Sequence, residues 1–248
     1  MRPARALALG LLHGPAELLP VSSSAHAALL LQGLEPERRK EVEVALHAGT
    51  LLALGPPSPA AWLVVATAPP ALAGARFERA IEQRLGGPRS IAAGLVAGGA
   101  AMVVADRASQ HRRSPSIGDA ALLGLAQAAA LMPGVSRHGA ALTALRARGF
   151  ARPDAHTISR EASKPVLAGA TALKGWRLAR RVAAARTAPA PRGAAGDVAT
   201  LALAAAGSAL STRLAARALA GRGVEAPLWP FAAYRVALAA VVVARAST

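Results

Sequence analysis

The stretch Gly10–His26 reads GLLHGPAELLPVSSSAH, and it decides how the rest of the chain is interpreted. Its leucine-rich first half is typical of a membrane helix, but that helix would carry the carboxylate of Glu17 and end at Pro20. An ionisable side chain costs about 2.5–3.5 kcal/mol at the centre of a membrane helix, so it indicates a functional site. Serines follow at 22–24, where hydroxyls and free backbone N–H groups at a helix start favour an anion. The stretch therefore predicts an intramembrane hydrolytic site for a phosphorylated lipid.

The composition favours an all-α, polytopic integral membrane protein. Of the 248 residues, 53% are hydrophobic and only 17% are charged, which is fewer charges than the about 25% of a typical soluble domain. No apolar run reaches the about 18 residues that identify a membrane helix by itself, but shorter apolar segments recur between basic loops. A soluble, alanine-rich helical protein is the alternative. The N-terminus also imitates a signal peptide with a cleavage site at 25–27, although His13 and Glu17 interrupt its apolar region.

The charge distribution indicates membrane headgroups as the basic chain's partner. Lysine and arginine number 29 against 13 acidic residues, and the arginines gather in loops between apolar segments, as expected of cytoplasmic loops. Aromatic residues make up only 3% of the chain, so the interleaved stacking positions of a nucleic-acid site are missing, and no nucleic-acid partner is expected. The chain has no cysteine, which excludes disulfides and thiolate metal sites.

The order of apolar segments predicts a series of helices, of which the first two are short. Neither a helix over 4–19 nor one over 24–33 is long enough to cross a hydrocarbon core of about 30 Å alone, which favours a re-entrant hairpin. The expected elements that follow are a charged loop 35–43, an apolar segment 42–54, a helix 60–75, an amphipathic linker 76–90, a helix 91–105 and a basic loop 106–117. In the second half they are a helix 154–175, a loop 177–196, and helices 197–216 and 229–244.

Residues 124–143 repeat the opening pattern as GLAQAAALMPGVSRHGAALT. Gly10 corresponds to Gly124, and in both stretches a proline and then a serine lead into a new helix. Two interrupted helices at corresponding positions indicate inverted-topology repeats, with a second re-entrant hairpin and a site near the membrane midplane. We expect one membrane domain over 1–248, made of two repeat halves at approximately 1–105 and 118–248.

Arg137 follows the Pro-Gly break of the second stretch and directly precedes the next helix. A guanidinium can hold two phosphate oxygens, and a helix N-terminus adds about half a positive charge. If the two hairpins meet, Glu17 and Arg137 share one pocket, in which Glu17 acts as general base or helps to hold a divalent cation. In the alternative interpretation, Arg137 lies at the membrane interface, and Glu17 is a structural carboxylate paired with a cation.

Serine and histidine side chains complete the candidate site. Ser23 is the preferred nucleophile, with helix capping as the alternative role of each serine. His13 lies four residues before Glu17 on the same helical face, and His26 is spaced to reach back towards the serines. Together with Arg137, the residues expected to bind the substrate are Ser22, Ser24, Ser136, Gly134 and His13.

The two motifs resemble the signatures of a known family. GLLHGPAELLPVSSSAH resembles the first signature of the bacterial undecaprenyl-diphosphate phosphatases, the bacitracin-resistance type, and PGVSRHG at 133–139 resembles the second. EVALHAGTLLAL at 43–54 and PFAAYRVALA at 230–239 also resemble segments of that family in the same order. The resemblance implies a multi-pass protein of the bacterial cytoplasmic membrane that hydrolyses undecaprenyl diphosphate to undecaprenyl phosphate and inorganic phosphate. It further implies a site facing the outer side and a divalent cation, Mg²⁺ or Ca²⁺.

The resemblance also assigns roles by position. It implies that Glu17 is a metal ligand, since this residue matches the second glutamate of the first family motif. The residues that match its catalytic positions are Glu17, Ser23, His26 and Arg137, while Ser22 and Ser136 match further motif serines.

His13 is the main departure, because the family usually has a glutamate or glutamine there. This departure leaves open an enzyme that has lost hydrolysis, or a non-hydrolytic polyprenyl-phosphate transporter or binder of the same fold. The expected partners are the lipid substrate and the membrane, and a homodimer is compatible with the sequence.

Overall fold

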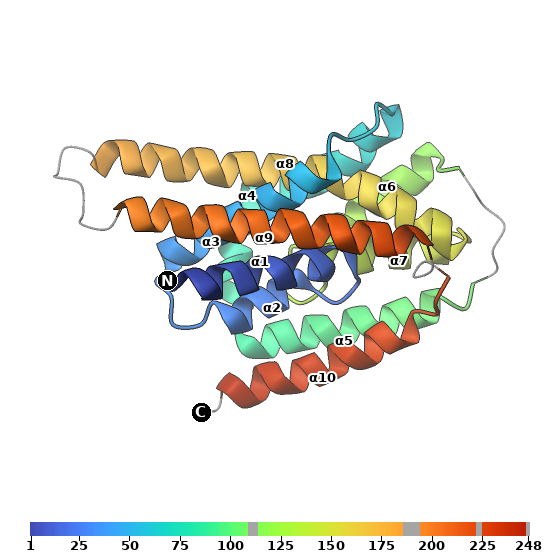
Figure 1. The fold of residues 1–248 in the computed structure, drawn as a ribbon. Helices are drawn as coiled ribbons and strands as arrows, with labels where there is room; N and C mark the ends of the chain where they lie inside the picture. The colour runs from blue at the N-terminus through green and yellow to red at the C-terminus, as the bar shows by residue number, and fades with distance from the viewer. Residues whose placement is uncertain (109–113, 186–193, 222–224, 247–248) are drawn as a thin grey trace.

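The computed structural model describes residues 1–108, 114–185, 194–221 and 225–246, and this part of the chain is helical with no β-strand (Figure 1). The helices in chain order are α1 (Pro3–Leu18), α2 (Ser23–Leu30), α3 (Pro36–Leu54), α4 (Ala61–Leu85), α5 (Pro88–Ala105), α6 (Ile117–Ala129), α7 (Arg137–Ala147), α8 (Arg152–Ala185), α9 (Ala194–Gly221) and α10 (Trp229–Ala246). The expectation of an all-α protein is confirmed for the described residues. Parts of the expected loops 106–117 and 177–196, at 109–113 and 186–193, lie outside them.

Three helices are longer than the sequence pattern predicts. The expected charged loop 35–43 forms the first two turns of α3, because Pro36 is suited to the first helical position and the charged residues after it are good helix formers. The expected linker 76–90 is mostly the last part of α4, since no proline or glycine interrupts residues 75–85. The last helix of the three, α8, continues to Ala185 and takes in the first part of the predicted loop. Charge alone does not end a helix, so the predicted loops over 35–43 and 177–185 were wrong, as was the prediction that the helix from residue 60 ends at residue 75.

Small residues bring several helices into close contact. A Cβ atom added to Gly10 of α1 would lie 2.3 Å from the carbonyl oxygen of Ala204 in α9. In the second half, a Cβ atom added to Gly124 of α6 would lie 2.8 Å from the ring of Pro69 in α4. Backbones that approach this closely gain van der Waals contact without needing large apolar side chains, as is common between helices in membranes.

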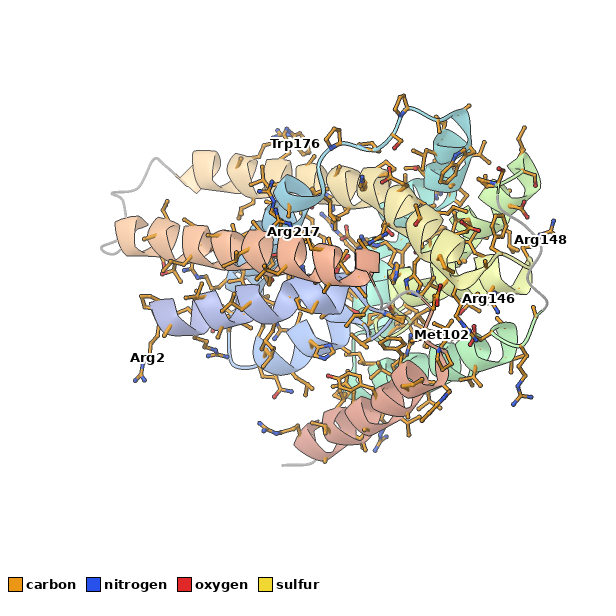
Figure 2. All side chains as sticks on the ribbon, turned by 45° about the vertical axis from the view of Figure 1, so that its right-hand side comes forward. Arg2, Met102, Arg146, Arg148, Trp176 and Arg217 are labelled. Carbon is orange, nitrogen blue, oxygen red and sulfur yellow. The ribbon has the colours of Figure 1, made fainter. Side chains whose placement is uncertain are left out.

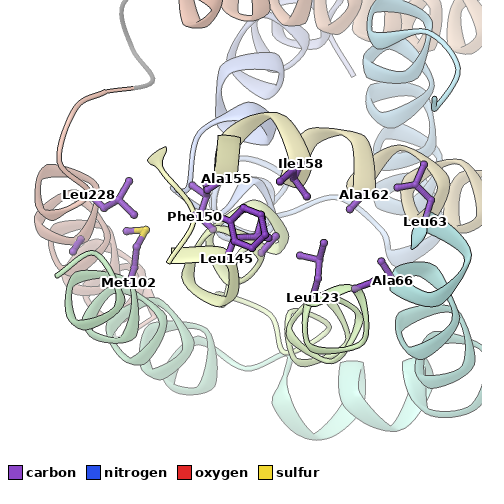
Figure 3. Packing of buried hydrophobic residues seen from close by; sticks show 14 residues of the cluster. Leu63, Ala66, Met102, Leu123, Leu145, Phe150, Ala155, Ile158, Ala162 and Leu228 are labelled. Atoms are coloured by element: carbon purple, nitrogen blue, oxygen red, sulfur yellow. The ribbon is translucent and has the colours of Figure 1, made fainter. Parts of the chain in front are cut away.

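The largest cluster of buried apolar side chains lies among α4, α5, α6, α7, α8 and the start of α10 (Figure 3). Its labelled members are Leu63, Ala66, Met102, Leu123, Leu145, Phe150, Ala155, Ile158, Ala162 and Leu228. The cluster fixes α7 against α6 and α8, and so it fixes the helix that begins with Arg137.

Three of the described helices are long and apolar enough to cross a membrane: α5, α9 over Asp197–Ala220, and α10. Each carries large apolar side chains on its outer surface, including Val104, Val198 and Val236, which are 68%, 68% and 53% exposed. Apolar surface of this kind on whole helices is typical of contact with lipid. The protein is therefore a membrane protein.

A buried ion-pair cluster closes the end of α5. Asp106 accepts hydrogen bonds of 2.9 Å from both Arg146 and Arg152, and its Oδ2 also accepts one from the backbone N–H of Leu228. Figure 2 shows Arg146 among the helices, whereas Arg148 projects at the edge of the molecule. Burial by itself raises the pKa of Asp106, but the hydrogen bonds from Arg152, Leu228 and Arg146 outweigh it and lower that pKa below its ordinary value of 3.8.

Candidate active site

The first motif places Glu17 at the end of α1 and starts α2 after a tight break. The helix ends before Pro20, as predicted, and α2 begins at Ser23. Between them Ser22 has a left-handed backbone with φ of 70°, and its Oγ accepts a hydrogen bond from the N–H of Ala25. The break returns the start of α2 to the last turn of α1, where the Ser23 hydroxyl contacts Glu17.

The second motif is built in the same way. Between α6 and α7, Gly134 has φ of 87° and Ser136 has φ of 66°. The Ser136 Oγ accepts a hydrogen bond of 3.1 Å from the N–H of Gly139 and so caps α7, whose first residue is Arg137. Ser22 and Ser136 are the two non-glycine residues with positive φ in the described part of the chain. The same local backbone therefore precedes both α2 and α7.

Glu17 and Arg137 share one pocket, and the predicted meeting of the two motifs is confirmed. The Nη1 atom of Arg137 lies 3.4 Å from Oε1 of Glu17, and the Ser23 hydroxyl donates a hydrogen bond of 2.6 Å to Oε2. The Glu17 side chain is only 9% exposed, so the guanidinium rather than water compensates its charge. Arg137 Nη1 makes no hydrogen bond to any described residue, which leaves this donor available to an anion.

Two histidines face the same carboxylate. His47 of α3 places its Nε2 atom 3.9 Å from Oε2 of Glu17, and the rings of His13 and His47 meet edge to face with centroids 5.0 Å apart. His13 is 7% exposed, and its buried Nε2 has no hydrogen-bond partner among the described residues. His47 was not among the predicted site residues. The signal for it was a single polar ring inside the apolar segment 42–54, which by itself is weak.

These groups line a cavity of about 450 Å³. The cavity continues past Glu17 to charged side chains from α3, α4 and α8, where Lys174 lies 3.3 Å from Glu78 and 3.8 Å from Glu43. Sequence reasoning missed these residues because it treated the segments from α3 and α4 as a loop and a linker. The charged residues that line the cavity are Glu17, Arg39, Lys40, Glu43, Glu78, Glu82, Arg137 and Lys174.

Most of the predicted site residues reach this cavity. Glu17, Arg137 and the following predicted residues line it: His13, Ser23, Ser24 and Ser136. Ser22 does not line it, and its side chain instead caps α2 and lies 3.1 Å from the Ser24 hydroxyl. Gly134 also lies outside the lining, packed so tightly that an added Cβ atom would come within 2.2 Å of the carbonyl oxygen of Ile91.

His26 is directed away from the cavity. Its Nδ1 contacts the backbone carbonyl of Ser22 at 2.8 Å, and its Nε2 lies 2.6 Å from the hydroxyl of Tyr234 in α10. The two rings are stacked with centroids 5.7 Å apart. The expectation that His26 reaches the serines holds only for the backbone of Ser22, and the ring has no contact with Glu17 or Ser23 that would support proton transfer.

Arg235 of α10 joins the two motifs, and sequence reasoning did not identify it. Its guanidinium is fully buried and donates hydrogen bonds to Pro20 in the first break and to Gly134 and Val135 in the second. It also donates to Gly94 and Leu95 of α5. The signal was a charged side chain inside the predicted apolar helix 229–244, the same kind of signal that drew attention to Glu17.

Comparison with known proteins agrees with the resemblance of the motifs. Residues 58–241 match the family model described as bacitracin resistance protein BacA. An undecaprenyl-diphosphatase of Geobacter sulfurreducens is 35% identical, with 96% of this chain and 96% of the relative covered. An undecaprenyl-diphosphatase of Elusimicrobium minutum is 36% identical over 70% of this chain and 76% of its own length. The chain belongs to the bacitracin resistance protein BacA family.

Proposed function

We propose that this protein hydrolyses undecaprenyl diphosphate to undecaprenyl phosphate and inorganic phosphate in the cavity between its two interrupted helices. The observation that carries the proposal is the arrangement of Ser23, Glu17 and Arg137 in one partly buried cluster, with contacts of 2.6 Å and 3.4 Å. The names of the relatives support the substrate and the reaction, because both of those described above are undecaprenyl-diphosphatases. Such an activity would recycle the lipid carrier of cell-wall synthesis and fits a family named for bacitracin resistance.

The cavity supplies positive groups for a diphosphate. Arg137 Nη1 lies 3.4 Å from Glu17 Oε1 but makes no hydrogen bond to a described residue, and Arg137 stands at the first position of α7. The first residues of α2, Ser23 and Ser24, line the same cavity, so two helix N-termini face it. A helix N-terminus contributes roughly half a positive charge, and together with the guanidinium this amounts to about two positive charges. Arg39, Lys40 and Lys174 also line the cavity, where the acids Glu43, Glu78 and Glu82 balance their charge.

The contact between Ser23 and Glu17 supports a role in the attack on phosphorus. With its hydroxyl donating to the carboxylate at 2.6 Å, Ser23 can transfer its proton to Glu17 as Oγ attacks the terminal phosphorus. The bond from that phosphorus to the bridging oxygen then breaks, and Glu17 gives its proton up to the leaving undecaprenyl phosphate. The ionised Glu17 next deprotonates a water that attacks the phosphoserine, the P–Oγ bond breaks, inorganic phosphate leaves, and Glu17 returns the proton to Ser23 Oγ. Direct attack by water on the lipid would use the same carboxylate and the same guanidinium.

The side chains around Glu17 do not match the expected Mg²⁺ or Ca²⁺. His13, Glu17 and His47 could together hold a metal ion, since one ligand atom of each lies within 4.8 Å of the others. Two of these three donors are imidazoles, whereas Mg²⁺ and Ca²⁺ prefer oxygen ligands. The steps above therefore use only the protein's own side chains.

The proposal includes an organisation in two inverted repeats, each with a re-entrant hairpin. The helix contacts support it. If α1–α5 are matched in order with α6–α10, so that α1 corresponds to α6 and α9 to α4, the contact of α1 with α9 corresponds to that of α6 with α4. In the same way, the contact of α2 with α10 corresponds to that of α7 with α5, and that of α3 with α9 to that of α8 with α4. We place this single domain in the bacterial cytoplasmic membrane, with its site open to the outer side, and a homodimer is compatible with it.

The alternative of a non-hydrolytic polyprenyl-phosphate transporter or binder is not favoured, because the relatives are named for hydrolysis. The deciding experiment is release of inorganic phosphate from undecaprenyl diphosphate by the purified full chain in detergent. Glu17→Ala and Arg137→Ala are each expected to lower kcat/KM by about a hundredfold or more, since each removes a charged group from the reacting centre. As a matched control, Arg217→Ala changes an exposed arginine of α9 (Figure 2) and should leave the rate unchanged. Unchanged activity in both site variants would refute the site.

A further inference from the structure

Three side chains that commonly bind metals converge at one point of the cavity. His13 and Glu17 project from the same face of α1, four residues apart, and His47 approaches from α3. Their ligand atoms lie within 4.8 Å of one another, and His47 Nε2 lies 3.9 Å from Glu17 Oε2. Ligand atoms around a tetrahedral ion with bonds of about 2.0–2.1 Å are about 3.3 Å apart, so a contraction of about an ångström would bring these three atoms to three of its four positions.

The polar atom of His13 supports a ligand rather than a packing role. Its Nε2 is buried and makes no hydrogen bond to any described residue. The side chain that carries this atom lines the cavity. A buried ring nitrogen without a partner costs free energy, which a bound cation would recover. His47 differs from His13 in this respect, because its Nε2 already lies 3.9 Å from the carboxylate of Glu17.

The carboxylate of Glu17 can serve two cations at once. Arg137 lies on the side of Oε1, while His47 and the Ser23 hydroxyl lie on the side of Oε2. A metal ion held between Oε2 and the two imidazoles would therefore sit on the opposite oxygen from the guanidinium. The same cavity is also lined by three further basic residues, Arg39, Lys40 and Lys174, and by three further acids, Glu43, Glu78 and Glu82.

We propose that His13, Glu17 and His47 form a metal site that selects a borderline transition-metal ion such as Zn²⁺ or Co²⁺ over Mg²⁺ and Ca²⁺. Two imidazoles and one carboxylate suit zinc and other first-row transition metals, whereas magnesium and calcium take mainly oxygen ligands. The inference deepens the proposed function, since it names the cation class of the same cavity.

The test is metal binding by the untagged full chain in detergent. After removal of metals with a chelator, Co²⁺ is titrated while its visible absorption is followed, and bound metal is counted by mass spectrometry. We expect one bound Co²⁺ that about a hundredfold excess of Mg²⁺ or Ca²⁺ fails to displace. His13→Ala and His47→Ala should each weaken Co²⁺ binding by about tenfold or more, and His26→Ala, which changes a histidine outside the cavity, should not.

His13→Glu supplies a second, positive test. It exchanges one imidazole for a carboxylate at the same place, so the preference for Co²⁺ over Ca²⁺ should narrow by about tenfold or more. The melting temperature of each metal-free variant shows whether it is folded. Displacement of Co²⁺ by equal Mg²⁺ or Ca²⁺, or wild-type Co²⁺ binding in both alanine variants, would overturn the proposal. Phosphate release is measured separately: selective Co²⁺ binding without hydrolysis keeps this site and refutes the proposed function, and hydrolysis without Co²⁺ binding does the reverse.

Discussion

Replacing Arg235 should damage both the stability of the protein and its site, although this residue does not line the cavity. Its buried guanidinium makes five hydrogen bonds of 2.9–3.3 Å to backbone carbonyl groups, three of them in the two breaks. In Arg235→Met those carbonyl oxygens lose their donors. A buried acceptor left without its donor costs about 1–3 kcal/mol, so the loss of several should cost about 3–5 kcal/mol, and at about 2–4 °C per kcal/mol the melting temperature should fall by about 6–20 °C.

The same substitution should lower the catalytic rate. Arg235 donates to Pro20, which follows Glu17, and to Gly134 and Val135, which precede Arg137. Without these bonds the acid and the guanidinium are no longer held together, and a displacement of about 1 Å can cost about a hundredfold in rate.

Thermal unfolding in detergent and phosphate release below the melting temperature measure the two effects of Arg235→Met separately. Arg217→Met, which changes an exposed arginine of α9, is the matched control. We expect kcat to fall by at least about tenfold in Arg235→Met and by less than about twofold in the control. If the two variants have the same melting temperature and the same kcat, Arg235 does not hold the two motifs together and the reasoning fails.

Three further predictions concern stability and the edge of the site. Asp106→Asn should lower the melting temperature at pH 7 by about 5 °C. Because folding lowers the pKa of Asp106 from 3.8, the ionised carboxylate stabilises the fold fully above about pH 4, and the difference in melting temperature from wild type should shrink on further acidification. Gly10→Ala should prevent α1 from packing on α9, because the added Cβ would lie 2.3 Å from a carbonyl oxygen, and little folded protein should elute on size exclusion. Gly169→Ala, which has open space around it, should yield normal amounts, and equal yields of the two variants would contradict the close packing. Tyr234→Phe removes the hydroxyl that contacts His26 outside the cavity, so kcat/KM should change by less than about threefold, and a hundredfold loss would place His26 in the chemistry.

The sequence predicted the parts of the site that depend on local signals. Pro20 and the serines after it set the end of α1 and the start of α2, and the Pro-Gly break does the same before Arg137, so the meeting of Glu17 and Arg137 could be inferred from two similar interruptions. His47 could not be inferred in this way, because its approach to Glu17 depends on how α3 packs beside α1.

The extents of the helices show a different limit of sequence patterns. Residues 36–43 and 76–85 are charged enough to resemble connections, yet they contain good helix formers and are helical. His26 was placed at the site from its spacing and from the family resemblance, but the rotation of α2 directs its ring to Tyr234. Such rotations follow from tertiary packing against α10, which no local pattern contains.

The position of Arg235 in the last helix also has a consequence for biosynthesis. The chain is made from its N-terminus, so Glu17 and Arg137 leave the ribosome well before α10 (Trp229–Ala246). Until that final segment is inserted, the carbonyl groups of both breaks lack the guanidinium that organises them. A nascent chain in the membrane would therefore hold Ser23, Glu17 and Arg137 and still be inert, and competence would arrive only once α10 has followed them into the membrane.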